Sequence, residues 1–354
     1  MNFQSVENIA NAVLYEGYML YPYRASSVKN RQRFNWGAVV PQSYSEAQNG
    51  TEAWEMQTQC LAIGTDSSTL TVKVRFLRLT DREVGKARSH GAPDDLEMVR
   101  ALEVSGELFQ AWQEAVEKDI ELPVLTLRGP QVVTFDFAFP ATRKTDPILD
   151  SSGLTAGAFL RTQAAIYARV RVRIDENVTP AEVKSSGCFK ITVTIQNTTE
   201  FKSASLASRD DALLSSLVST HTILGIEGGE FVSLIDPPEA YKNVAPECKN
   251  IGTYPVLAGS EGGRDCILSS PIILYDHPEI APESAGNLFD GTEIDEILTL
   301  RIMTMTDAEK REMRSIDDRA RAILERTEIM PNEQLQKMHG AVRGLNKVTK
   351  PTYG

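Results

Sequence analysis

The segment WEMQTQCLAIGTDSSTLTVKVRF, residues 54–76, decides the fold expected for the first half of the chain. On both sides of a turn-rich connector, residues 64–68, apolar side chains recur at every second position with few exceptions. A period of two is typical of a strand with one buried face and one exposed face. The segment therefore predicts two strands that form a hairpin.

Three further segments show the same period of two and are predicted to be strands: residues 132–139, 159–174 and 189–196. Between them, residues 107–121 are a candidate helix, and residues 140–155 are expected to form a long loop because they contain two prolines and several turn residues. A short amphipathic helix is expected at residues 5–15. The first 200 residues thus predict a mainly antiparallel β-region, either a sandwich or a strongly twisted sheet.

The pattern changes after residue 200. Asp210 and Asp211 favour a helix N-terminus, and the residues that follow predict a helix to about Thr222. Two glycine-rich segments, residues 227–230 and 259–263, separate apolar runs. Glycine between two such runs predicts the turn of a hairpin.

Towards the C-terminus the apolar spacing becomes that of helices. Thr306 and Glu309 predict a capping box, and Ser315 is a candidate cap for the next helix. The whole chain is therefore expected to be an α+β protein. It would comprise a mainly β domain over residues 1–200 with an N-terminal helix, and an α+β region over residues 201–354 that ends in helices.

The 354 residues carry a net charge of −11, which disfavours non-specific binding to nucleic acid because that binding depends on Lys and Arg. No apolar run approaches the ~20 residues that a membrane-spanning helix needs. The N-terminal residues lack the charged and apolar regions of a secretory signal. We therefore expect a soluble, cytoplasmic protein whose four cysteines are reduced.

The common catalytic motifs are missing: the chain has no GxGxxG after a strand, no GxxxxGK[ST], no HExxH and no GxSxG. Their absence argues against the most frequent nucleotide-binding and hydrolase classes. No catalytic residue and no cofactor is assigned from the sequence, and a binding protein is favoured over an enzyme.

One candidate metal site lies in a proline-punctuated loop, where Asp276, His277, Glu279 and Glu283 cluster within eight residues. Carboxylate and imidazole groups that converge on a rigid loop can bind a divalent metal. The simpler interpretation is that Asp276 and His277 make turn and capping hydrogen bonds that order the loop.

A second candidate combines two thiols and two imidazoles, the usual ligands of zinc: His221, Cys248, Cys266 and His277. Their spacing matches no known short motif. Buried free thiols, and a core histidine on the apolar face of the expected helix after Asp211, are the simpler interpretation.

A partner-binding surface is the functional prediction that follows from residue types. Residues 18–33 concentrate tyrosine and arginine, which are enriched in interface hot spots. The loop of residues 275–289 supplies acidic groups, and these could equally pair with the cations inside the monomer. The surface is predicted to include Tyr21, Tyr23, Arg24, Arg31, Arg33, Asp276, Glu279 and Glu283.

Several blocks of the chain resemble a bacterial protein family encoded near uptake [NiFe]-hydrogenases in actinobacteria and other soil bacteria. The longest are VLYEGYMLYPYRASSVKNRQRF, residues 13–34, and SSPIILYDHPEIAPESAGNLFDGTEIDEILTLR, residues 269–301. RDDALLSSLVSTHTIL and FVSLIDPPE, residues 209–224 and 231–239, resemble the same family.

The resemblance implies a non-catalytic accessory, assembly or scaffold protein whose partners are hydrogenase subunits or maturation factors. It transfers no catalytic role to any residue. Two alternatives stay open at this point. One is a metal-binding protein or metalloenzyme that uses His221, Asp276, His277 and Glu279, and the other is a β-sandwich adaptor with an unrelated partner.

Overall fold

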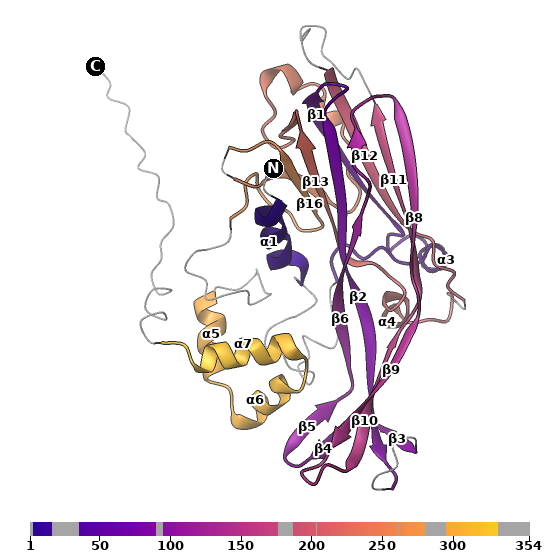
Figure 1. Cartoon of the computed structure of the whole chain (residues 1–354), viewed down its shortest axis with the longest axis vertical. Coiled ribbons are helices and arrows are strands. Elements are labelled where there is room, and N and C mark those ends of the chain that lie inside the picture. Colours follow the sequence, from indigo (N-terminus) through magenta and orange to yellow (C-terminus); the bar gives the residue numbers. More distant parts are fainter. Residues whose placement is uncertain are drawn as a thin grey trace.

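A computed structural model describes residues 3–15, 35–89, 95–175, 187–202, 204–260, 262–279 and 295–331. In this part of the chain, antiparallel strands dominate and helices gather at the C-terminal end (Figure 1). The α+β class, with a mainly antiparallel β-region followed by a helical segment, is confirmed.

One sheet has five strands, in the order β14 (Glu230–Val232), β1 (Glu55–Gly64), β12 (Gly187–Asn197), β11 (Ile166–Asp175) and β8 (Gln131–Phe139). The long strands pair without interruption, β1 with β12 over ten residue pairs and β11 with β8 over nine. In β11 and β8 the more buried side chains alternate with more exposed ones, which explains the period of two in the sequence of these strands.

The second sheet is built on β2 (Thr69–Ala87), a strand of 19 residues. Its main path runs β15 (Tyr254–Ala258), β16 (Cys266–Ser270), β13 (Val218–Glu227), β2, β10 (Thr155–Gln163) and β9 (Thr142–Leu149). Three more strands pair with β2 off this path: β3 (Leu96–Val99), β6 (Trp112–Glu121) and β7 (Leu125–Thr126). A separate pair consists of β4 (Ala101–Val104) and β5 (Glu107–Gln110).

The largest cluster of buried apolar side chains takes members from both sheets. Phe76 of β2 packs edge-to-face on Phe139 of β8, with ring centroids 5.3 Å apart. The Thr58 hydroxyl on β1 donates a hydrogen bond to the Ser269 hydroxyl on β16, at 2.8 Å. Burial of these apolar rows supplies the main driving force for folding.

The helices cover the second sheet. α1 (Phe3–Leu14) buries Val6, Ile9 and Ala10 in one cluster with residues of β13, β15 and β16. Two short helices, α3 (Gln42–Ala47) and α4 (Arg209–Leu213), lie in connections. At the C-terminal end lie α5 (Asp295–Met303), α6 (Asp307–Arg314) and α7 (Asp318–Glu328). The short 3-10 turns are η1 (Glu239–Tyr241) and η2 (Ala245–Glu247).

The predicted capping box is confirmed, because Thr306 and Glu309 exchange the expected hydrogen bonds at the start of α6. The cap of α7 is Asp317, whose carboxylate accepts a hydrogen bond from the Ala320 amide. The prediction of Ser315 as that cap was wrong, because Ser315 closes the C-terminal end of α6 instead.

The predicted hairpin at residues 54–76 was wrong, because its two strands belong to different sheets. The turn at residues 65–68 carries the chain from one sheet to the other. The flanking strands show the same period of two whether they pair in a hairpin or belong to two sheets. Residues 107–121 form β5 and β6 instead of a helix, since β6 finds ten partners along β2. The expected loop at residues 140–155 contains β9, where Pro147 is tolerated because β9 lies at a sheet edge.

Two further elements differ from expectation. The single long strand at residues 159–174 is two strands in different sheets, β10 and β11. The helix predicted to reach Thr222 ends at Leu213, because the following residues pair with β2 as β13 and are rich in β-branched side chains. The glycine turn at residues 227–230 also joins two sheets, whereas the β15–β16 hairpin is confirmed.

Strands from both sides of residue 200 share the second sheet, since β13, β15 and β16 join β2 and β10 in it. The division of the chain into two domains, residues 1–200 and 201–354, therefore stays a prediction.

Candidate functional site

The segment after β16, residues 271–279, is fastened to the edge of the second sheet. The Asp276 carboxylate accepts hydrogen bonds from the Leu257 amide at 2.8 Å and from the Ser233 hydroxyl at 2.5 Å. The His277 amide donates to the Leu257 carbonyl at 2.7 Å. These are the turn and capping bonds that the simpler interpretation of Asp276 and His277 expected. They fix the segment to β15 and to the chain that leaves β14.

The side chains of this segment alternate between protein and solvent. Leu274 packs against the apolar cluster beneath α1, and the Asp276 carboxylate points to the backbone amide of Leu257. Ile273 and Tyr275 point outwards and are 71% and 82% exposed. We call Ile273 and Tyr275 the exposed pair. Because the residues on either side are anchored, the exposed pair is held in a fixed position at the surface.

The predicted partner-binding residues divide into three groups. Tyr21, Tyr23, Arg24, Arg31, Arg33 and Glu283 lie outside the described residues. Asp276 is committed to holding the backbone, whereas Glu279 is exposed. The sequence reasoning missed Ile273, because the run Ile272–Tyr275 is apolar throughout and does not show which of its side chains face solvent.

His221 lies on strand β13, so the expectation that it belongs to a helix was wrong. It is fully buried, with Nδ1 2.7 Å from the Ser219 carbonyl and Nε2 3.2 Å from the Ser270 hydroxyl. Burial lowers the pKa of His221 to about 4, so the imidazole is neutral. A neutral ring that donates from Nδ1 accepts the Ser270 proton at Nε2.

A hydroxyl beside an imidazole is the core of many nucleophilic sites. Here both side chains are fully buried, and the Ser270 hydroxyl oxygen also accepts a hydrogen bond from the Ile272 amide at 3.1 Å. The pair therefore joins β13 to the beginning of the 271–279 segment. Sequence reasoning missed Ser270, since only the strand register places it opposite His221.

The four residues of the second candidate metal site are not brought together, and Glu283 of the first candidate site lies outside the described residues. β16 and β15 lie between His221 and the backbone of His277, and strands are ~4.8 Å apart, so the two backbones are separated by about 14 Å. Cys266 pairs with Gly225, four residues along β13 from His221. Cys248 packs in another cluster, with Cys188. Within the described ranges, no group of three or more His, Cys, Asp or Glu side chains could hold a metal ion.

All four cysteines are free thiols. Burial raises the pKa of Cys188 and of Cys248 to about 11, and it raises that of Cys60 as well. These three thiols therefore stay protonated at neutral pH, which makes them weak nucleophiles.

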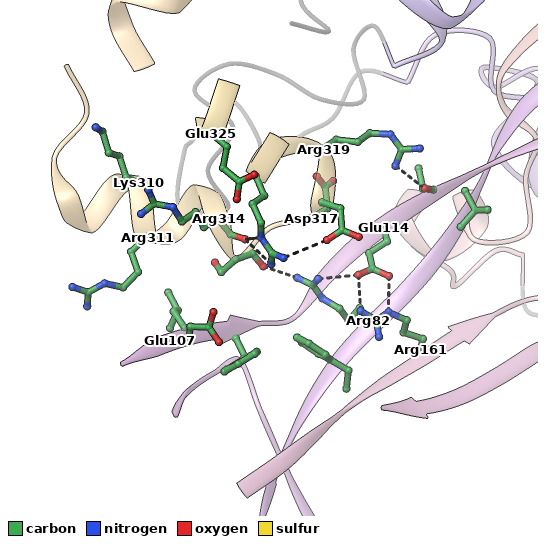
Figure 2. A pocket seen from close by; sticks show the side chains of 18 of the residues that line it. Arg82, Glu107, Glu114, Arg161, Lys310, Arg311, Arg314, Asp317, Arg319 and Glu325 are labelled. Atoms are coloured by element: carbon green, nitrogen blue, oxygen red, sulfur yellow. Dashed lines mark hydrogen bonds and ion pairs between the residues drawn. The ribbon is translucent and has the colours of Figure 1, made fainter. Parts of the chain in front are cut away.

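A cavity of about 1140 Å³ lies where β5, β6 and β10 face α6 and α7 (Figure 2). On its floor, the Glu114 carboxylate accepts hydrogen bonds from Arg82 Nη1 and Arg161 Nε, each at 2.8 Å. The two guanidinium carbons lie 4.8 Å and 4.9 Å from the centre of the Phe159 ring. Asp146 holds Arg161 from the other side at 2.6 Å.

The same cavity contains the contacts that fasten the C-terminal helices to the sheet. Arg82 Nη2 donates to the Ser315 carbonyl at 2.9 Å, and the Gln110 side chain donates to the Ser315 hydroxyl. Arg319 pairs with Glu117 at 3.1 Å. Because both signs of charge line the cavity and its buried members pair with one another, its chemistry explains attachment of the helices and selects no single class of ligand.

Among the helices of the described residues, none is long and apolar enough to cross a membrane. Comparison of the chain with protein-family models and with curated proteins finds no match.

Proposed function

We propose that this protein is a non-catalytic accessory, assembly or scaffold protein that acts by protein–protein recognition. The observation that supports recognition is the exposed pair, Ile273 and Tyr275, on a segment whose backbone is anchored. The partner class rests on the resemblance of residues 13–34 and 269–301 to proteins encoded near uptake [NiFe]-hydrogenases. Hydrogenase subunits or maturation factors are the proposed partners.

The physical basis is the low cost of binding through side chains that are already ordered. Tyrosine brings a large apolar ring and a hydroxyl, and it is enriched among residues that carry binding energy. An anchored backbone loses little conformational entropy when a partner binds. Glu279 lies four residues after Tyr275 and is exposed, so it can supply a charge at the rim.

The tyrosine- and arginine-rich segment of residues 18–33 belongs to the same proposal. Its side chains would complete one surface with the 275–289 loop: Tyr21, Tyr23, Arg24, Arg31, Arg33, Glu279 and Glu283. The cations of this surface would recognise acidic groups on the partner.

We also propose that the two sheets form a sandwich. The contacts between them support this arrangement: the shared apolar cluster, the Phe76–Phe139 ring contact and the Thr58–Ser269 hydrogen bond. A sandwich provides a stiff body on which a recognition segment keeps its geometry.

The test is co-purification with the large and small subunits of an uptake [NiFe]-hydrogenase. The variant is Ile273→Ser with Tyr275→Ser, and the control is Leu206→Ser with Ile329→Ser, whose side chains are 88% and 81% exposed elsewhere on the molecule. We expect the first variant to lose the hydrogenase subunits at an unchanged melting temperature and the control to retain them. If neither subunit co-purifies with the unaltered chain, the hydrogenase subunits are not its partners. If both variants behave alike, the exposed pair is not the binding surface.

A further inference from the structure

Strand β8 is an open sheet edge of a kind that proteins rarely leave uncovered. It pairs with β11 over nine residues without a bulge, and no strand of the described residues pairs with its other side (Figure 1). An open edge presents unpaired backbone N–H and C=O groups to any other strand. Along its inward face four apolar side chains are only partly buried: Val133, Phe135, Phe137 and Phe139.

Four other described edges, those of β9, β15, β6 and β14, are either protected by a recognisable device or very short. β9 carries Arg143, Lys144 and Pro147, and a bulge interrupts its pairing with β10. Asp276 and His277 bond the backbone of β15. Charges and prolines at an edge, bulges and covering loops are the usual means of preventing unwanted strand pairing.

Two more edges are those of β6 and β14, and the remaining edge strands, β3, β4, β5 and β7, have only two to four residues each. β6 is rich in acidic side chains, and Arg319 donates to its Ala115 carbonyl. β14 has only three residues. β8 has no lysine, no proline and one charged residue, Asp136, whose carboxylate is held by Arg169 at 2.7 Å. Within the described chain, β8 is therefore the long edge that lacks protection.

The sequence of β8 is complementary to itself in antiparallel pairing about a two-fold axis at Phe135. In this register all nine residues find partners. Val133 of one copy faces Phe137 of the other, and Phe135 faces Phe135, so the partly buried apolar row continues across the axis. On the outward face, Asp136 meets Thr134 of the second copy. A register shifted so that the axis passes through Asp136 would place two carboxylates opposite each other, which is unfavourable.

We propose that the protein forms a two-fold symmetric dimer by pairing β8 with β8 of a second copy, which joins the two five-stranded sheets into one. The occupant of the edge is another copy of this chain because the register that pairs every residue also covers the phenylalanines and keeps like charges apart. Such an interface is isologous, as expected of a two-fold dimer. The exposed pair plays no part in it, so dimerisation is independent of the proposed hydrogenase partner.

Sedimentation equilibrium of the full-length chain over a range of concentrations tests the proposal. The unaltered protein is expected to have twice the monomer mass of 39.1 kDa. The decisive variant is Thr134→Asp, which puts a carboxylate opposite Asp136 of the second copy at two symmetric places. In the monomer the new carboxylate faces Arg171, the cross-strand partner of position 134, so the fold tolerates it. Dimer affinity is expected to fall about tenfold or more.

The matched control is Thr194→Asp, because Thr194 faces the same Arg171 from β12, on the side away from the edge. This variant is expected to remain dimeric, as is Thr134→Lys, whose cation faces Asp136 of the second copy. A monomeric unaltered protein would overturn the proposal. So would a dimer that is weakened equally by Thr134→Asp and Thr194→Asp, or one that neither change affects.

Discussion

Replacing Arg82 by Met would remove the most buried guanidinium of the charged cavity while keeping most of the apolar stem. The Arg82 side chain is only 5% exposed and donates to three different partners, the Glu114 carboxylate and the carbonyls of Gln110 and Ser315. The Ser315 contact joins β2 to the turn between α6 and α7. We expect this single change to weaken both the sheet and the attachment of the C-terminal helices.

The magnitude follows from what the substitution leaves behind. Breaking a buried ion pair by removing one partner costs ~3–5 kcal/mol, because the other charge stays buried and unpaired. Glu114 would still accept hydrogen bonds from two nitrogens of Arg161, at 2.8 Å and 3.1 Å, so its charge would remain paired. Two carbonyls would lose a charged donor, at ~1–3 kcal/mol each when they stay dry. We therefore expect the free energy of unfolding to fall by about 3 kcal/mol.

Urea unfolding followed by circular dichroism measures this loss, with Arg88→Met as the control. Arg88 and Asp95 form a solvent-exposed ion pair at 3.8 Å, and such ion pairs contribute ~0–1 kcal/mol to the free energy of unfolding. Hydrogen exchange should also show faster exchange in α6 and α7 of the Arg82 variant. A loss below about 1 kcal/mol, or no change in helix exchange, would refute the idea that Arg82 holds the helices to the sheet.

Three further outcomes are expected. The pKa of His221 is about 4 in the folded protein, against 6.5 for an exposed histidine. Between these two pH values the unfolded chain binds a proton at His221 and the folded protein does not. The contribution of His221 to the free energy of unfolding is therefore complete above pH 6.5 and is lost as the pH falls towards 4. Urea unfolding at several pH values should show about 3 kcal/mol of this dependence, and His221→Gln should lack it. A thiol reagent at pH 8 should react only slowly with the native protein, because burial raises the pKa of the Cys188 and Cys248 thiols. After denaturation the same reagent should react quickly with all four thiols. Thr306→Ala should lower the free energy of unfolding by about 1 kcal/mol in urea titrations, by removing the cap of α6, and equal stability of Thr304→Ala and Thr306→Ala would contradict that role.

Local pattern predicted the elements whose form depends on their own residues. The strands at residues 132–139 and 189–196 follow from their period of two, and the capping box of Thr306 and Glu309 from its spacing. The β15–β16 hairpin follows from its glycine turn. In these cases one segment, or two adjacent ones, contains the whole signal.

Tertiary pairing decided the rest. Residues 112–121 form strand β6 because β2 is long enough to pair along them, and no local pattern shows the length of a partner strand. The turn at residues 65–68 looks the same whether the chain pairs with its neighbour or crosses to another sheet. Ser270 could not be assigned to His221 without the strand register.

The predicted partner-binding surface also combines features that the sequence shows with features that only the fold shows. The acidic residues of the loop and the tyrosines and arginines of residues 18–33 were visible in the sequence, and they predicted a binding surface that includes residues 275–289. The anchoring of Asp276 by Leu257 and Ser233, which fixes the exposed pair in place, depends on contacts with strand β15 and with the residue that follows β14. Residue types thus indicated a binding region, whereas its presentation needed the fold.

Titration of the purified chain against the purified hydrogenase subunits, followed by bio-layer interferometry, tests the central claim most directly. The account predicts saturable binding that Ile273→Ser with Tyr275→Ser weakens by about thirtyfold or more, because exposed aromatic anchors carry roughly 2 kcal/mol or more of binding free energy. Leu206→Ser with Ile329→Ser should leave the dissociation constant unchanged. Equal affinities for both double variants, or no saturable binding by the unaltered chain, would contradict it.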